Sequence, residues 1–229
     1  MLLANCRTRC VTLLQKYVGH DWVLVHRAGF SFRNNQGSHS NPGYWSFPGM
    51  PPPQMPPRSD YLPKLNVCIA FSSKGVSEPF IQRVGEKFDY KTYMSEFVEK
   101  KMMPFINSNH SNVRNVVVWA DAQPAFSNKN VLAYLDGKGI KHVDKEDNPG
   151  NRVKCFSYFL NFLRNQMYDG WHAKNEAQLA NRICEYLRAI DMNVVKRLAN
   201  DTEKRIGEMA TSGELNSWSD KTQKYTSRY

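Results

Sequence analysis

The sequence has no run of about 18 consecutive apolar residues, the length that a membrane-spanning helix requires. It also has no Cys-x-x-Cys pair, and its five cysteines are an odd number. These absences argue against a disulfide framework and favour free thiols in a reducing compartment. The apolar start at residues 1–4 is too short for the core of a signal peptide, and the charged residues Arg7 and Arg9 come soon after it. We therefore expect free cysteines and no membrane partner.

Two of the cysteines, Cys6 and Cys10, are four positions apart on a predicted helix. That spacing places both side chains on one face, where they could orient two metal ligands. A helix face that packs against the core gives the same spacing, because free cysteine is a common core residue. Both interpretations stay open at the level of sequence, and no metal site is assigned.

The composition is that of a globular, basic protein. Apolar residues make up 41% and aromatic residues 12% of the 229 positions, which is enough for one large domain with a core. The formal net charge is +10, and the excess of lysine and arginine is spread along the chain. A diffuse positive field is compatible with nucleic-acid binding, but it also simply improves solubility.

Hydrophobic periodicity predicts helices and strands in a defined order. Apolar residues at helical spacing predict helices over residues 2–18, 90–105, 128–135, 153–168 and within 174–209. Apolar runs bounded by polar residues or glycine predict strands over residues 22–26, 29–33, 65–71, 76–81, 116–120 and 140–143. The second of these strands is expected to be the hairpin partner of the first. Asp191 is expected to cap a new helix in the C-terminal part.

Residues 42–57 hold seven of the twelve prolines. Proline lacks the N–H donor, so this segment is neither a helix nor a central strand. A partner with an aromatic groove could bind it as a polyproline segment. The alternative is a surface crossover that covers the edge of a sheet. The polar residues 214–229 are expected to fray as a tail.

The predicted order is strands, helix, strand, helix, strand and further helices. It is the order of an RNase H-like α/β domain, a mixed sheet flanked by helices, here with a C-terminal helical extension. We expect this domain to span residues 1–213, with the proline-rich loop inserted in it.

One aspartate stands out in this frame. Residues 116–124 read Val-Val-Val-Trp-Ala-Asp-Ala-Gln-Pro, an apolar strand that ends in Asp121 and a turn. The helix over residues 90–105 precedes it, and a helix, a strand and a loop come after it. This arrangement resembles the catalytic domain of mariner-type (DDE) transposases, in which an Asp-Asn-Ala-Pro-like motif follows the same strand. The resemblance covers roughly residues 5–213.

The resemblance places Asp121 at the second catalytic aspartate of that family. The family's asparagine is replaced by Ala122, and a downstream histidine by Phe126. The stretch Val23–Phe32 is similar to the strand that supplies the first catalytic aspartate, and His26 occupies that position.

The third carboxylate of the family precedes an aromatic residue in a loop that opens a helix. Aligning that aromatic residue with Phe156 places Val153 at the carboxylate position. A small gap does not change this, because residues 148–158 contain no aspartate or glutamate.

These replacements matter for the chemistry. Two magnesium ions about 4 Å apart need several hard oxygen ligands between them. Asp121 alone cannot hold both, so the resemblance implies a vestigial Asp121, degenerate positions at His26 and Val153, no catalytic residues, and neither metal nor cofactor.

Arg27, Arg152 and Lys154 would bring positive charge close to the former metal site. That charge suits contact with nucleic-acid phosphates, and these three residues are the nucleic-acid-binding candidates. The alternative for them is a solvated loop.

The leading functional hypothesis is a catalytically inactive, domesticated transposase domain that acts in the nucleus. It would bind DNA or chromatin, protein partners of a nuclear complex, or a second copy of itself. The family's paired N-terminal helix-turn-helix domains are missing, so the chain is either a fragment or has lost them. Exposed aromatic residues are candidate partner contacts, although each is also ordinary packing: Tyr44, Trp45, Phe47, Trp171 and Trp218.

Two alternatives belong to other classes. One is a surviving magnesium-dependent nuclease that draws on a pool of carboxylates: Asp21, Asp121, Asp144, Glu146 and Asp147. The other is a structural homodimer without a nucleic-acid role, with the proline-rich loop or the C-terminal helices as its interface.

Overall fold

The computed structural model describes residues 3–32, 64–150, 153 and 156–213. Its centre is a six-stranded sheet in the order β3-β2-β1-β5-β6, with β4 also paired to β2. The strands are β1 (Asp21–Ser31), β2 (Lys64–Ser72), β3 (Gly75–Val76), β4 (Phe80–Gln82), β5 (Val116–Trp119) and β6 (Lys141–His142). The pair β1 and β2 is antiparallel, while β1 with β5 and β5 with β6 are parallel. The predicted mixed sheet is confirmed.

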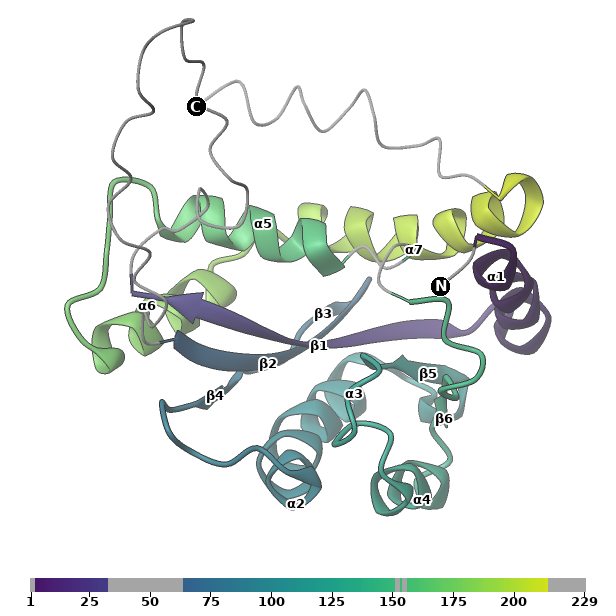
Figure 1. The fold of residues 1–229 in the computed structure, drawn as a ribbon, viewed down its shortest axis with the longest axis horizontal. Helices are drawn as coiled ribbons and strands as arrows, with labels where there is room; N and C mark the ends of the chain where they lie inside the picture. The colour runs from purple at the N-terminus through teal and green to yellow at the C-terminus, as the bar shows by residue number, and fades with distance from the viewer. Residues whose placement is uncertain (1–2, 33–63, 151–152, 154–155, 214–229) are drawn as a thin grey trace, which may run out of the picture.

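Helices cover both faces of this sheet (Figure 1). One face packs against α1 (Leu3–Tyr17), α5 (Phe156–Met167), α6 (Glu176–Arg188) and α7 (Met192–Ser212). The other packs against α2 (Tyr90–Thr92), η1 (Tyr93–Met102), α3 (Met103–Asn109) and α4 (Lys129–Gly137). A short 3₁₀ turn, η2 (Val113–Asn115), leads into β5.

The alternation of side chains along β1 divides the core in two. Leu24, Ala28 and Phe30 belong to the cluster under α1, α5, α6 and α7. Val23 and Val25 belong to the cluster on the opposite face. Because successive strand residues point to opposite faces, neighbours along β1 serve different layers of the fold.

Most of the predicted elements are confirmed, and Asp191 does cap α7, since its side chain accepts a hydrogen bond from the backbone N–H of Asn193. The helix predicted over residues 90–105 continues to Asn109, and its middle part, η1, is π-helical. None of the described helices has the length and apolar character that crossing a membrane would need.

The predicted hairpin between residues 22–26 and 29–33 is wrong. Residues 21–31 form one continuous strand, and its antiparallel partner is β2, with Ala28 opposite Val67 and Gly29 opposite Asn66. β2 pairs with β1 continuously from Leu24 to Ser31, on both sides of Ala28–Gly29, so no turn forms there.

The strand predicted over residues 76–81 is instead two short strands, β3 and β4, which pair with β2 at different points. Pro79 lies between them and has no N–H to donate to a ladder. The proline-rich loop at 42–57 and the tail at 214–229 lie outside the described residues.

Candidate functional site

The register of the sheet brings His26 and Asp121 together. In the parallel pairing of β1 with β5, Leu24 lies opposite Trp119, so the positions two residues further along each chain meet. Nδ1 of His26 contacts Oδ2 of Asp121. The Asp121 side chain is only 5% exposed and that of His26 is 21% exposed. The carboxylate is thus withdrawn from water and partnered by an imidazole.

The surroundings of Asp121 disfavour further charge. Burial raises the pKa of the Cys68 thiol to about 12, and the nearby Asp121 charge acts in the same direction against the opposing effect of Arg27. Burial likewise raises the pKa of Tyr93 well above its ordinary value, and Cys68 and Asp121 add to that shift. Phe126 is buried on Tyr93, with ring centroids 4.5 Å apart. Buried groups, among them the aromatic Tyr93, therefore lie near Asp121 on this side.

The segment that the resemblance aligns with the family's third carboxylate, with Val153 at that position, is apolar where it meets the pair. Val153 is fully buried in the core, and its backbone oxygen accepts a hydrogen bond from Nε of Arg205 at 3.0 Å. Phe156 packs its ring 4.5 Å from the imidazole of His26. An aromatic ring thus faces His26 from this side.

Asn148 fixes the loop that leads to Val153. Its Oδ1 accepts hydrogen bonds from Nε1 of Trp119 at 3.2 Å and from the backbone N–H of Gly150 at 2.9 Å. Its Nδ2 donates to the oxygen of Ala120 at 3.3 Å. One buried amide thereby ties the loop to the end of β5, directly before Asp121.

Arg27 lies on the opposite face of β1 from His26. It donates to Oε1 of Gln82 at 2.6 Å, and its guanidinium lies 4.3 Å from the ring centre of Phe88. Its role as a phosphate contact stays a prediction. The other two candidates, Arg152 and Lys154, lie outside the described residues.

The helix face of Cys6 and Cys10 packs into the core. Both thiols are buried, and burial raises the pKa of Cys10 to about 12. Cys6 donates a hydrogen bond to the oxygen of Pro149 at 3.4 Å. Together with Cys68 and Cys184, they are free cysteines among the described residues. The core-packing interpretation of the spacing is therefore the correct one.

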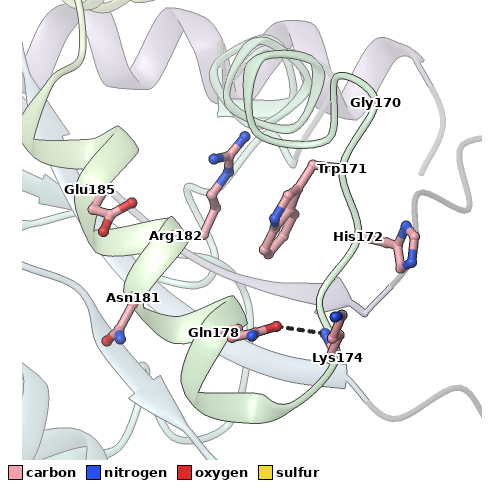
Figure 2. A pocket seen from close by; sticks show the side chains of 8 residues that line it. All are labelled: Gly170, Trp171, His172, Lys174, Gln178, Asn181, Arg182 and Glu185. Atoms are coloured by element: carbon pink, nitrogen blue, oxygen red, sulfur yellow. Dashed lines mark hydrogen bonds between the residues drawn. The ribbon is translucent and has the colours of Figure 1, made fainter.

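An open hollow lies elsewhere, between the loop after α5 and the face of α6 (Figure 2). Trp171, Lys174 and Arg182 are among its lining residues. Neither His26 nor Asp121 lines it. Of these residues only Trp171 stands out in the sequence, as an aromatic residue outside the predicted elements.

The remaining carboxylates of the predicted pool do not converge on Asp121. Asp147 pairs with Lys16 at 2.5 Å, and Asp144 lies 3.4 Å from His142. Glu146 is exposed. In the described part of the chain, no three His, Cys, Asp or Glu side chains form a group that could hold a metal ion.

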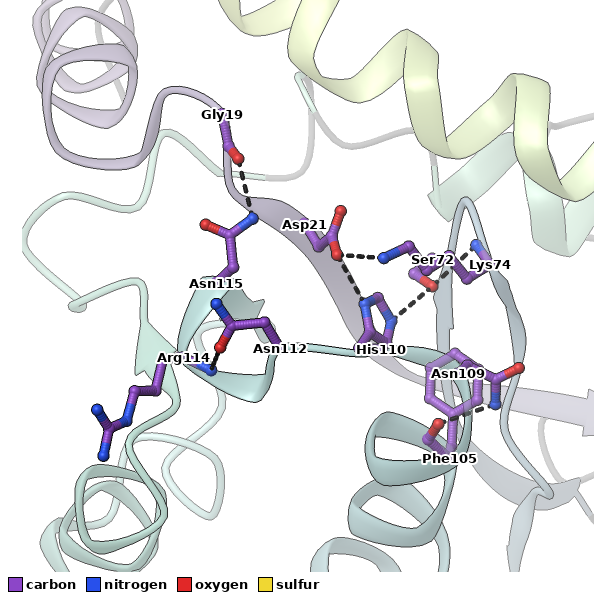
Figure 3. Close-up of polar contacts among 10 residues, drawn as sticks. All are labelled: Gly19, Asp21, Ser72, Lys74, Phe105, Asn109, His110, Asn112, Arg114 and Asn115. Atoms are coloured by element: carbon purple, nitrogen blue, oxygen red, sulfur yellow. Dashed lines mark hydrogen bonds and ion pairs between the residues drawn. The ribbon is translucent and has the colours of Figure 1, made fainter.

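Asp21 belongs to a separate polar cluster at the start of β1 (Figure 3). Its Oδ2 lies 2.5 Å from Nζ of Lys74 and 3.0 Å from Nδ1 of His110, whose Nε2 lies 3.1 Å from Oγ of Ser72. Ser72 and His110 are buried, and the Ser72 hydroxyl also accepts from the backbone N–H of Lys74. The order Asp–His–Ser is that of a hydrolase triad. Here, however, the serine is closed off from solvent, and the cluster joins the end of α3 to the sheet.

The fold is shared with solved transposase structures. The Mos1 transposase paired-end complex with left transposon end superposes with a TM-score of 0.70 at 14% identity, covering 92% of this chain. The mariner Mos1 paired end complex with Mg gives 0.70 at 15% identity, also over 92% of this chain. The chain spans 62% of the length of the transposase chains in both complexes.

The match covers nearly the whole of an isolated catalytic domain. The structure of the Mos1 transposase catalytic domain and Raltegravir with Mg superposes with a TM-score of 0.65 at 13% identity, covering 92% of this chain and 94% of that one. No protein-family model and no curated protein sequence matches the chain. The chain therefore has the RNase H-like fold of a mariner transposase catalytic domain, and the resemblance expected from the sequence is confirmed at the level of structure.

Proposed function

We propose that the chain is a transposase-derived domain that no longer performs two-metal chemistry and acts as a binding module in the nucleus. The contact between His26 and Asp121 carries this proposal. At the positions that the resemblance assigns to two neighbouring metal-binding carboxylates, the chain has one carboxylate and one imidazole.

The donors at this place do not fit a pair of magnesium ions. Magnesium prefers oxygen ligands in near-ideal octahedral geometry, and a two-metal site needs carboxylates that bridge or flank both ions. Asp121 presents its Oδ2 to His26, and the apolar Phe156 ring packs 4.5 Å from that imidazole. A single, already partnered carboxylate leaves both ions short of ligands.

Binding is the function that the rest of the chain supports. The net charge of +10 favours a polyanion such as DNA, and the Mos1 structures with the same fold include a paired-end complex with a transposon end. DNA or chromatin is therefore the first proposed partner, with protein partners of a nuclear complex as the second. The nuclear location follows from these partners.

The surviving-nuclease alternative rests on the same fold, since Mos1 complexes are known with Mg and with Mn. It requires Asp121 to leave His26 and to bind a cation together with carboxylates that lie elsewhere. The separate pairings of Asp21 and Asp147 count against this rearrangement.

Two measurements on one preparation test the proposal. Fluorescence anisotropy of a labelled duplex over a salt series should show binding that weakens as salt rises. The logarithm of the association constant should fall linearly with the logarithm of the salt concentration, with a slope of about −0.9 for each phosphate contact. Supercoiled plasmid incubated with the protein and Mg²⁺ or Mn²⁺ should stay intact. Nicking that disappears in Asp121→Asn but persists in the exposed control Glu99→Ala would overturn the loss of chemistry. Absence of duplex binding at low salt would overturn the proposal that DNA is the partner. Protein partners would then be the remaining proposal.

A further inference from the structure

The hollow beside α6 has a volume of about 530 Å³ and is open to solvent. Its loop side is formed by Trp171, His172 and Lys174, and its helix side by Asn181, Arg182 and Glu185 (Figure 2). The volume falls in the range of about 300–1,000 Å³ that is usual for small-ligand sites. The lining combines an indole ring, two cations, an imidazole, two amides and one carboxylate.

The loop side is held in place by backbone hydrogen bonds. The N–H of Ala173 donates to the oxygen of Phe32, which follows β1, at 2.8 Å, and Ala173 is buried. The N–H of Lys174 donates to Oε1 of Gln178 at 3.0 Å, and Asn175 caps α6. The hollow is therefore preformed rather than assembled from a free loop.

Arg182 is fixed between two aromatic rings. Its guanidinium carbon lies 4.7 Å from the ring centre of Trp171 and 4.8 Å from that of Tyr186, and its Nε donates to the oxygen of Met167 at 3.3 Å. These contacts orient the guanidinium without neutralising its charge.

The cations of the hollow have no acidic partner. Among the described residues, no carboxylate forms an ion pair with Arg182, Lys174 or His172. Glu185 is the single acid in the lining. The local charge is therefore positive and available to an anion.

We infer that this hollow binds one nucleotide unit of an unpaired nucleic-acid strand. The Trp171 ring, partly exposed beside Arg182, offers a stacking surface for a base. Asn181 and Glu185 can satisfy hydrogen-bonding groups on the base edge, while Lys174 and Arg182 attract the phosphate. A free phosphate would leave the ring and the amide without a role.

The inference goes beyond the proposed function, because it concerns a different site and does not depend on the loss of metal chemistry. Paired bases within a duplex offer no free ring face to Trp171. A duplex partner therefore contacts the protein elsewhere, and the two kinds of binding can be measured separately.

The test uses the full chain and a fluorescently labelled oligothymidylate of about ten nucleotides. A strand of the same length built from abasic sites is the comparison, because it keeps the phosphates and lacks the bases. The base-containing strand should bind at least about 5-fold more tightly, since stacking on an aromatic side chain is worth roughly 1–3 kcal/mol per base. Equal affinity for both strands would overturn the inference.

Variants assign the binding to the hollow. Trp171→Ala should weaken oligothymidylate binding by about 5- to 150-fold, the range expected for one stacked base. Lys174→Glu, at an exposed position, should weaken it by at least about 10-fold through charge reversal. The matched control Lys196→Glu on α7 reverses the same charge at another exposed position and should bind like the unaltered chain.

Circular dichroism shows whether Trp171→Ala still folds, and Lys174→Glu provides a second test that does not disturb packing. Unchanged affinity in a folded Trp171→Ala or in Lys174→Glu would overturn the inference. Polyglutamate that displaces the labelled strand as well as unlabelled oligothymidylate does would also overturn the inference. It would show a surface that binds any polyanion and not a nucleotide site.

Discussion

His26 and Asp121 face each other where the parallel strands β1 and β5 bring corresponding positions side by side. Because the Asp121 side chain is almost fully buried, its Oδ2 faces the imidazole of His26 more than water. A second carboxylate at residue 26 would repel Asp121 unless a cation lay between them. An imidazole at this position contacts Asp121 directly, without an intervening cation.

Removing the imidazole should therefore destabilise the fold. His26→Ala removes the imidazole that contacts the buried carboxylate of Asp121, and we expect a loss of about 2 kcal/mol in the free energy of unfolding at pH 7. Urea denaturation followed by circular dichroism measures the change. In the double variant with Asp121→Asn the loss should be smaller than the sum of the two single losses. Additive losses would mean that the two side chains do not interact.

The loop before Val153 should depend on Asn148. Asn148→Ala removes the acceptor of the Trp119 indole N–H and of the Gly150 N–H, and the donor to the Ala120 oxygen. Because Asn148 and Trp119 are both buried, we expect the variant to lose about 2 kcal/mol. The exposed control Asn200→Ala should change stability by less than about 0.5 kcal/mol. If Asn148→Ala and Asn200→Ala unfolded at the same urea concentration, the loop would not depend on Asn148.

The cluster around Asp21 predicts a pH-dependent contribution to stability. Burial alone would raise the pKa of Asp21, but hydrogen bonds from Lys74 and His110 outweigh it, and the pKa lies below its ordinary value. A carboxyl whose pKa is lowered by folding stabilises the protein above its unfolded pKa of about 3.9, and this contribution is lost as the pH falls through the folded value.

Asp21→Asn should accordingly be less stable than the unaltered chain at pH 7, by about 1 kcal/mol. The difference should shrink as the pH is lowered below about 4. Unfolding midpoints in urea from pH 7 down to pH 2.5 give the comparison. A difference of the same size at both ends of the range would mean that the charge of Asp21 contributes nothing.

The sequence carried enough information for the layers of the fold, because long apolar runs and helical stripes are local signals. The continuous β1 was not predicted, since Ala28–Gly29 has the composition of a turn and only the long pairing with β2 keeps it extended. The division of residues 75–82 into β3 and β4 likewise depends on where β2 can pair.

The sites were predictable to different degrees. The resemblance singled out His26 and Asp121 separately, and their contact follows only from the parallel register of β1 and β5. The link from Asp21 to His110 joins residues 89 positions apart, and no local pattern marks it. Trp171 stands out as a lone aromatic residue, whereas its pairing with Arg182 requires α6 to fold back on the loop.

The most direct test of the central claim is a titration with Mn²⁺, followed by the loss of its free-ion electron paramagnetic resonance signal. The unaltered chain should leave the signal of millimolar Mn²⁺ unchanged, whereas His26→Asp, which places a second carboxylate against Asp121, should bind the ion and gain thermal stability from it. Stoichiometric Mn²⁺ binding by the unaltered chain, abolished in Asp121→Asn, would contradict the account.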